Sequence, residues 1–250
     1  MADEVLTERR GRVLVITLNR PDSRNAINSA LAQQLVEAIE ILDSDPSLTA
    51  GVLAGAGGGF CSGMDLKAFA AEGPPKRFTP FIENGSAKPL IAALEGYAVA
   101  GGFEIALVCD LLVAARGTRL GIPEVKVGLF AAAGGLLRLQ RHVPYGVAME
   151  MCLTGDLITA ERAHDYGLVS HLTEPGQALE TALSLAERIA ANAPLAVAAT
   201  KRIIRDSQGL TEQEFWDLQK PLVAPVFKSD DAKEGPRAFS EKRAPAWAGR

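Results

Sequence analysis

Cysteine is scarce in this sequence, and its charge shows no basic excess. The 250 residues include three cysteines (Cys61, Cys109 and Cys152), with no pair spaced as C-x-x-C. This spacing argues against a disulfide framework and a thiolate zinc site, and we expect no bound metal. The net charge of −4 argues against a nucleic-acid binder.

Long apolar runs are also missing. No run approaches the roughly 20 residues that cross a bilayer, and the first residues contain no cleavable hydrophobic leader. We therefore expect a cytoplasmic protein with no membrane partner. The length and the 48% hydrophobic content allow one large core.

The first half of the chain alternates short apolar runs with helical patterns. Helices are predicted after Asn28 or Ser29 and from Gly101 to about Cys109, and strands over 12–18, 50–55, 89–98 and 111–116. This succession indicates an α/β domain with a buried sheet.

The pattern changes after about residue 144, where helical periodicity dominates. Thr159 and Gly167 are a good N-cap and C-cap for a short helix. The segment 67–89 has mixed charges and no firm periodicity, which predicts a mobile surface segment.

A glycine-rich segment follows the second predicted strand. "AGAGGGFCSGMDL" (54–66) contains five glycines, which can bring backbone N–H groups close to a ligand oxygen. It lacks the GK[ST] ending of a phosphate-binding loop, and from composition alone a tight turn explains it equally well.

Two acidic residues stand in unusual places. Glu104 follows Gly101 and Gly102 in the first turn of a predicted helix, where N–H groups and the helix dipole favour negative charge. Glu124 lies 20 residues later, a separation that can return it to the same end of the sheet. Taken singly, Glu104 can be a dipole cap worth ~0.3–1 kcal/mol, and Glu124 a surface carboxylate paired with Lys126.

Five segments in this order together indicate a family. "FCSGMDL", "GYAVAGGFEIALVCD" and "GIPEVKVGLFAAAGG" follow "LNRPDSRNAIN" and precede "EGPRAFSEKRAP". The chain resembles the enoyl-CoA hydratase/isomerase, or crotonase, family from about Val13 to Trp247. "AGGFE" has two glycines where other members have three.

The resemblance implies a reaction and roles for four residues. Family members bind acyl-CoA thioesters, and two backbone N–H groups hold the thioester carbonyl. These groups here match Met64 and Gly101 and would form an oxyanion hole. Members that hydrate trans-2-enoyl-CoA to 3-hydroxyacyl-CoA hold water between two glutamates, which match Glu104 and Glu124. The resemblance implies no cofactor, since coenzyme A is part of the substrate.

The resemblance also suggests residues near coenzyme A. These are Asn25, Ala26 and Ile27 on the nucleotide and pantetheine side, Asp65, Leu66 and Lys67 along the thioester, and Phe227 and Lys242 in the C-terminal helices, which often cover a neighbouring subunit's ligand.

The implied fold is a crotonase-like (ClpP/crotonase) spiral of β-β-α units over residues 1–190, followed by a helical trimerisation region over 191–250. A homotrimer or a hexamer of two trimers is expected.

Other acyl-CoA reactions of the family, such as those of its racemases and decarboxylases, remain open, and so do three further functions. A Δ3-Δ2-enoyl-CoA isomerase can work with one glutamate near Glu124, and a non-catalytic acyl-CoA-binding protein would need neither. A serine hydrolase built on Ser62 lacks a placed histidine, since His142, His164 and His171 all lie in the helical half. The acyl chain length and the pathway stay open.

Overall fold

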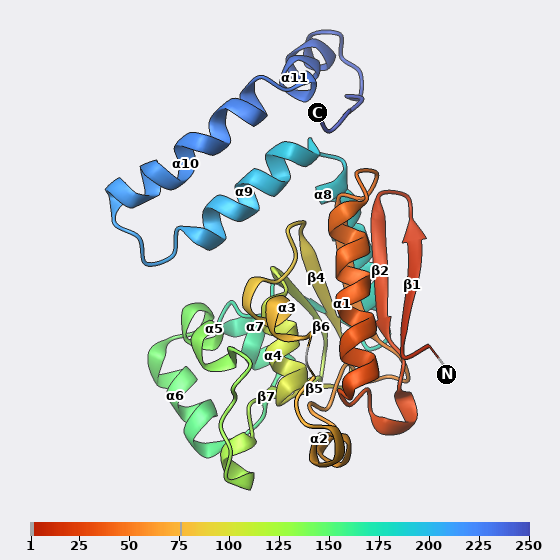
Figure 1. The fold of residues 1–250 in the computed structure, drawn as a ribbon, viewed down its shortest axis with the longest axis vertical. Coiled ribbons are helices and arrows are strands. Elements are labelled where there is room, and N and C mark those ends of the chain that lie inside the picture. Colours follow the sequence, from red (N-terminus) through yellow and green to blue (C-terminus); the bar gives the residue numbers. More distant parts are fainter. Residues whose placement is uncertain (1–2, 76) are drawn as a thin grey trace.

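The computed structural model describes residues 3–75 and 77–250. Its main sheet has the strand order β1-β2-β3-β4-β6-β9, in which only β1 and β2 are antiparallel neighbours (Figure 1). The strands are β1 (Val5–Arg10), β2 (Val13–Leu18), β3 (Ala50–Gly55), β4 (Leu90–Leu94), β6 (Leu111–Ala115) and β9 (His171–Thr173).

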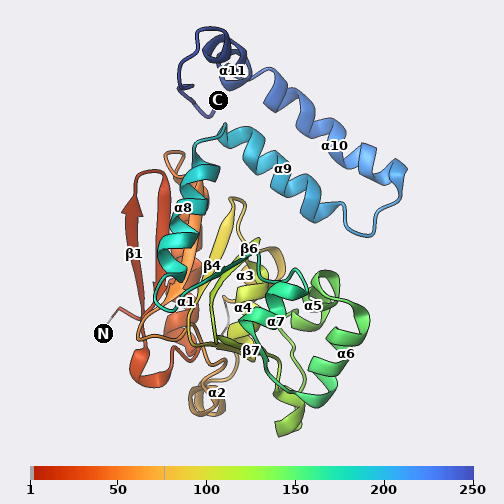
Figure 2. The same ribbon diagram turned by 180° about the vertical axis from the view of Figure 1, so that it is seen from behind.

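Both faces of this sheet are buried, which explains its continuous apolar runs. In β2, Leu14 and Ile16 belong to the larger core on the side of helix α1 (Ser29–Ser44). Val13 and Val15 face the other way and pack in the core beneath helix α8 (Ala178–Ala190), which covers the back of the sheet in Figure 2. The α/β prediction is therefore confirmed.

A second, smaller sheet contains β5 (Tyr97–Val99), β7 (Arg119–Gly121) and β8 (Ile158–Thr159). The prediction of one strand over 89–98 is wrong, because the chain leaves the main sheet after Leu94 and enters the second sheet at Tyr97. Gly96 makes this change of direction with φ +58°, and a side chain there would lie 2.4 Å from the Gly58 carbonyl oxygen.

The remaining elements of the body are helices and 3-10 turns, of which α4 and α7 contact the second sheet. They are α2 (Leu66–Glu72), α3 (Thr79–Asn84), α4 (Gly101–Val108), α5 (Gly135–His142), α6 (Tyr145–Thr154), α7 (Ala160–Asp165) and the 3-10 turns η1 (Pro21–Ser23) and η2 (Glu124–Val127). The segment 67–89, predicted without regular structure, thus contains most of α2 and all of α3.

Several predicted helix ends are confirmed. Asn28 caps α1 by accepting a bond from the Leu31 amide at 2.8 Å. Thr159 caps α7, whose C-cap is Tyr166 rather than the predicted Gly167; this glycine follows with φ +80°.

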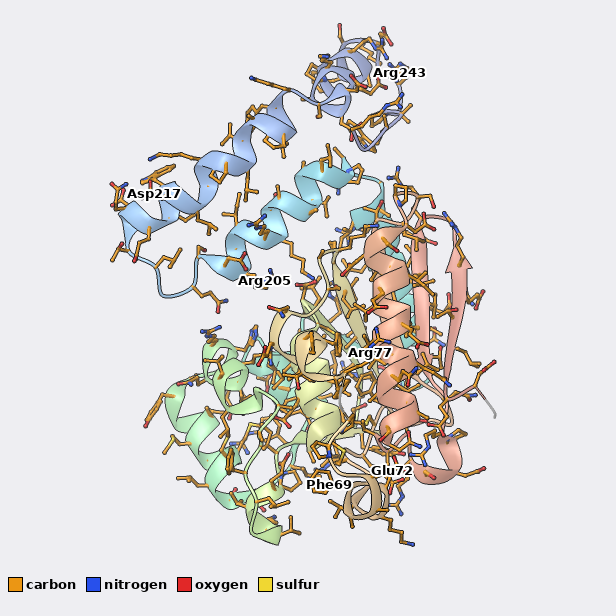
Figure 3. The ribbon with its side chains drawn as sticks, viewed as in Figure 1. Phe69, Glu72, Arg77, Arg205, Asp217 and Arg243 are labelled. Carbon is orange, nitrogen blue, oxygen red and sulfur yellow. The ribbon has the colours of Figure 1, made fainter. Side chains whose placement is uncertain are left out.

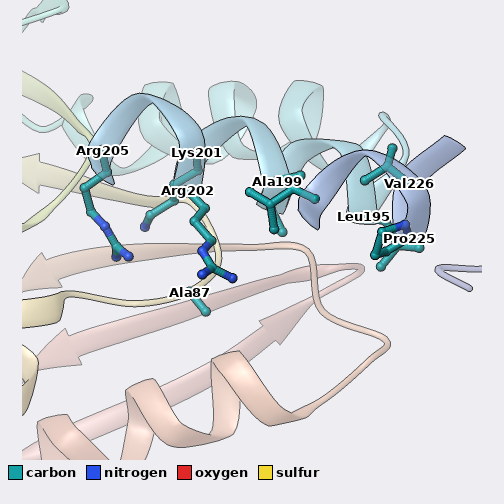
Figure 4. A pocket seen from close by; sticks show the side chains of 10 residues that line it. Ala87, Leu195, Ala199, Lys201, Arg202, Arg205, Pro225 and Val226 are labelled. Carbon is teal, nitrogen blue, oxygen red and sulfur yellow. The ribbon is translucent and has the colours of Figure 1, made fainter. Parts of the chain in front are cut away.

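The C-terminal arm, residues 194–250, extends away from the sheets (Figures 1 and 2). It contains α9 (Pro194–Asp206), α10 (Glu212–Phe227) and α11 (Asp230–Ser240), and neither α9 nor α10 has a buried residue. Figure 4 shows a pocket between these two helices, with Leu195 and Ala199 of α9 near Pro225 and Val226 of α10. The predicted division at 190/191 coincides with the end of α8 and stays a prediction.

The last ten residues fold back onto the start of the arm. Glu234 binds the Arg243 guanidinium at 3.0 Å, and Asp231 accepts bonds from backbone amides of the tail. Trp247 Nε1 donates to the Ala191 carbonyl oxygen at 2.7 Å. The tail therefore ties α11 to the junction between α8 and α9.

Among the residues that the structure describes, no helix combines the length and the apolar character that a bilayer crossing requires.

Candidate active site

Two backbone N–H groups lie free beside the start of α4. The Ile27 amide donates to Gly63 O at 2.8 Å, and the Asp65 amide donates to Ile27 O at 2.9 Å, so Met64 between them turns its own N–H the other way. Gly101 is the first residue of α4, and its N–H has no acceptor within the helix. In the described parts of the chain, neither N–H donates a hydrogen bond.

These two groups are close together. A methyl group added to Gly101 would lie 3.6 Å from the Met64 nitrogen. The approach requires unusual backbone at two residues, Gly63 at φ +99° and Ala100 at φ +52°. A positive φ is costly for alanine, and such strain clusters at functional sites. The structure therefore brings together the two donors that the sequence predicted.

Glu104 is held by the loop that precedes α5. The residue is 3% exposed, and its Oε1 accepts bonds from the amides of Ala133 at 2.8 Å and Gly135 at 2.9 Å. Burial raises the pKa of Glu104, while the two amide bonds oppose that rise. The carboxylate thus has a fixed position and one oxygen left for another partner.

Glu124 opens η2, where burial raises the pKa of its carboxyl group. Its Oε2 is buried without a hydrogen-bond partner among the described residues. Lys126 pairs with Asp156 at 2.6 Å, so the surface pair of Glu124 with Lys126 is not formed.

The two acids interact electrostatically. After burial and the Gly135 amide bond, the negative charge of Glu124 is the next influence on the Glu104 pKa, and it raises that pKa. A negative charge near a carboxyl group disfavours its ionised form. An arrangement of this kind can hold one proton between the two acids, which suits acid–base chemistry.

Comparisons with known proteins identify the family. The family model described as "Enoyl-CoA hydratase/isomerase" matches residues 8–250. The chain belongs to the enoyl-CoA hydratase/isomerase family. The family match and hydratase-named relatives make it an enzyme of the hydro-lyase kind.

Two relatives and two solved structures illustrate the likeness. Enoyl-CoA hydratase EchA19 of Mycobacterium tuberculosis is 44% identical, with 99% of this chain and 97% of the relative covered. For 2,3-dehydroadipyl-CoA hydratase of Escherichia coli the identity is 39%, with 99% of each covered. Crystal structures of enoyl-CoA hydratase from Mycobacterium tuberculosis H37Rv and carnitinyl-CoA hydratase from Mycobacterium avium are 54% and 40% identical, with TM-scores of 0.95 and 0.80 and complete coverage of each chain. The crotonase fold is confirmed.

The three predicted coenzyme A residues before α1 differ in burial. Asn25 is fully buried, and its side chain donates to Ala56 O at 2.9 Å and Gly59 O at 2.8 Å. Ile27 is 1% exposed, whereas Ala26 is half-buried. The Asn25 side chain therefore holds the backbone of the glycine-rich loop. A contact of the three residues with coenzyme A stays a prediction.

The predicted residues at the start of α2 differ in exposure, since Asp65 is half-buried. Asp65 caps α2 through the Ala68 amide at 3.2 Å and pairs with Arg20 at 3.2 Å, which lowers the Asp65 pKa together with the amide bond. Leu66 and Lys67 are exposed and follow Met64 directly.

Phe227 and Lys242 lie on the arm, and both are exposed. Figure 3 places Arg243, the neighbour of Lys242, at the opposite end of the molecule from Phe69 and Glu72 of α2. The structure does not bring the arm residues to the α2 end of the same chain.

The alternative nucleophiles have no supporting geometry. Burial raises the pKa of the Cys61 thiol to about 12, which keeps it protonated. Within the described ranges, no histidine is bonded to Ser62; His164 Nδ1, for example, bonds Val169 O at 2.8 Å. No cluster of three metal-ligating side chains occurs in residues 3–75 and 77–250.

The sequence reasoning missed one charged residue beside the acids. Arg138 of α5 is half-buried, and its positive charge acts on Glu104. A helical arginine 34 positions after Glu104 gives no signal in a single sequence. The only hint is its place one turn after the glycine pair that opens α5.

Proposed function

We propose that this enzyme adds water to the double bond of trans-2-enoyl-CoA and forms 3-hydroxyacyl-CoA. The observation that carries the proposal is the position of the two glutamates, with Glu104 buried and Glu124 half-buried with an unpartnered oxygen, in a fold whose described residues also leave the N–H groups of Met64 and Gly101 free. The names of the relatives support it, since several are hydratases or dehydratases of acyl-CoA thioesters.

The two N–H groups would bind the thioester carbonyl oxygen. Addition at C3 pushes negative charge onto that oxygen, and Met64 and Gly101 donate from fixed backbone, with the start of α4 adding its positive dipole. Loss of one such donor typically costs about 3–4 kcal/mol of transition-state stabilisation.

The proton balance assigns different states to the two acids. Glu104 accepts a proton from water as the oxygen bonds to C3, and Glu124 gives its proton to C2. The pair therefore holds one proton before and after the reaction, and no electron is gained or lost. We accordingly propose that the reaction needs no cofactor.

Hydrogen bonding supports this assignment. Two amides favour the ionised form of Glu104, whereas the unpartnered Oε2 favours the neutral form of Glu124. The raised pKa of each group keeps one proton available in the pair at higher pH than two ordinary carboxyl groups would allow.

The test is turnover of crotonyl-CoA, followed as loss of the conjugated enoyl absorbance, by Glu104→Gln and Glu124→Gln. Each variant should lose at least ~100-fold in kcat, the scale of general acid–base catalysis, with KM little changed. Glu187→Gln, on the exposed side of α8, is the matched control and should keep wild-type turnover.

Full turnover by both site variants would refute the proposal. A panel of enoyl-CoA lengths with a 3-enoyl-CoA included separates hydration from isomerisation: an isomerase would convert the 3-enoyl substrate and depend mainly on Glu124.

We further propose that the protein forms a homotrimer or a dimer of trimers. The support is the arm, whose helices α9 and α10 bury no residue in the single chain although α10 presents Trp216, Val223 and Phe227. A neighbouring subunit would cover this surface, and Phe227 and Lys242 would then contact coenzyme A in the neighbour's site. A cytoplasmic location remains our expectation.

A further inference from the structure

Arg138 connects two parts of the site that are remote in sequence. From α5, its Nη1 donates to the Ala133 carbonyl oxygen at 3.3 Å. Its Nη2 donates to the carbonyl oxygens of Ile82 and Glu83, the latter at 3.4 Å. One planar guanidinium therefore spans the loop before α5 and the C-terminal end of α3.

The Arg138 guanidinium contacts a different structural feature at each end. The Ala133 N–H donates to Glu104, and the Ala133 carbonyl oxygen accepts a bond from Arg138. The acid and the arginine therefore bind the same residue through its two backbone groups. Ile82 and Glu83 lie in the last turn of α3, where carbonyl oxygens have no N–H donor within the helix. A cation is favourable at such an end.

The space around Arg138 is closely filled. Gly134 adopts φ +85°, and a side chain there would lie 2.2 Å from Arg138 Nη1. The Arg138 amide also donates to Gly134 O at 3.0 Å. The loop that holds Glu104 thus depends on the position of the guanidinium as well as on its own glycines.

We propose that Arg138 is a positioning residue that fixes the Glu104 loop relative to α3, so that the segment 67–89 and the water-activating acid stay in register. The proposal rests on the function proposed for Glu104. It gives α3 a direct mechanical link to the chemistry, and so a route by which the segment that contains α3 can affect turnover.

The charge of Arg138 supports the role. It lowers the pKa of Glu104 and opposes both burial and the charge of Glu124 of η2. Arg138 itself interacts with Arg141 of the same helix and with the Cys109 thiol after α4, in addition to Glu104. Removal of Arg138 should therefore leave Glu104 protonated up to a higher pH.

The test compares Arg138→Met and Arg138→Lys with Arg205→Met. Arg205 of α9 donates to Asn84 O at 2.7 Å, so it binds the same end of α3 without contacting the Glu104 loop. Lysine keeps the charge of Arg138 but loses the fork that reaches both partners. The three variants separate charge, position and helix capping.

We expect Arg138→Met to lower kcat for crotonyl-CoA about 10- to 100-fold, the cost of small misplacement, with KM within a few-fold of wild type. Its acid limb in kcat/KM should move to higher pH. Arg138→Lys should lose kcat while keeping the wild-type limb, and Arg205→Met should retain both. Equal losses in Arg138→Met and Arg205→Met, or an unmoved limb in Arg138→Met, would overturn the proposal.

Hydrogen–deuterium exchange provides a readout that does not require turnover. Peptides covering 131–137 should exchange faster in both Arg138 variants and at the wild-type rate in Arg205→Met. If the wild-type enzyme hydrates no enoyl-CoA but this pattern holds, the proposed function fails and the positioning role stands. Unchanged exchange in Arg138→Lys overturns the role, even where Arg138→Met does not fold.

Discussion

Glu124 combines partial burial with an oxygen that no described residue satisfies. A buried polar atom without a partner costs about 1–3 kcal/mol, and an ionised carboxylate adds a desolvation penalty. This cost is reasonable if the oxygen binds a water molecule or transfers its proton to a substrate carbon during the reaction. Function and stability therefore oppose each other at this residue.

Glu124→Gln should stabilise the protein at pH 8 by about 1 kcal/mol, or 2–4 °C in Tm for a chain of this size. Burial holds the folded-state pKa of Glu124 above its unfolded value of about 4.3. Above the folded-state pKa the charge destabilises the fold, and below the unfolded value both states are neutral.

The gain in Tm should therefore shrink as the pH falls from 8 towards 5. Thermal denaturation of both proteins across this range measures it. A gain that is absent at pH 8, or that grows on acidification, contradicts the account of Glu124.

At this scale the sequence identified the acids but not their surroundings. Two glycines before Glu104 and the match to a family placed Glu104 and Glu124 at a site. The amides of Ala133 and Gly135 that bind Glu104 lie about 30 residues later, and such long-range partners follow from the fold rather than from local pattern.

At the scale of elements, the start of α4 lies unusually close to the segment that carries Met64. Of the two adjacent glycines, only Gly102 is required for this approach. A methyl group on Gly102 would lie 2.3 Å from the Cys61 carbonyl oxygen, whereas one on Gly101 would meet only ordinary contacts of 3.5 Å or more.

Gly101→Ala and Gly102→Ala should consequently affect different properties, the first catalysis and the second stability. Gly101→Ala puts a methyl group beside the two N–H donors, so kcat/KM for crotonyl-CoA should fall about 100-fold with Tm nearly unchanged. Gly102→Ala overpacks against backbone and should cost about 1–3 kcal/mol of stability.

Kinetics and thermal denaturation of the two purified variants decide the matter. Wild-type kcat/KM in Gly101→Ala would show that the two N–H groups do not bind the reacting carbonyl. Gly146→Ala, in an open position on α6, is the control for the Gly-to-Ala change.

The predictable elements were those with strong local signals. The β-branched run of β2 and the cap of α1 were predicted, because the residues themselves favour those conformations. The division of 89–98 between two sheets was not, since both halves are apolar and only Gly96 marks the turn. The exposed strand β1 and the short β8 and β9 owe their pairing to neighbours that local pattern does not reveal.

At the scale of the whole molecule, the arm has little core of its own within the described chain. Its exposed aromatic residues lie far from α2, so a contact of Phe227 with coenzyme A requires a second subunit. The order of an α/β body followed by helices could be predicted from the sequence, but the spiral and the direction of the arm could not, because they depend on packing between distant elements.

Mixed oligomers test this arrangement. Phe227→Ala alone should raise KM for acyl-CoA by several-fold, and Glu104→Gln alone should be inactive. When the two chains are co-expressed, a Phe227→Ala body beside a Glu104→Gln arm forms an intact site, and a fraction of activity with wild-type KM should return. Activity confined to the high-KM form would place Phe227 outside the neighbour's site.

The bond from Trp247 to Ala191 gives the final residues a use that their position at the end of the chain does not suggest. They fix the C-terminal arm against the end of α8, so in the oligomer that we propose each subunit would present an arm of set direction. The fold of one chain would then set the geometry of the complex. Subunits could dock without any rearrangement of the arm.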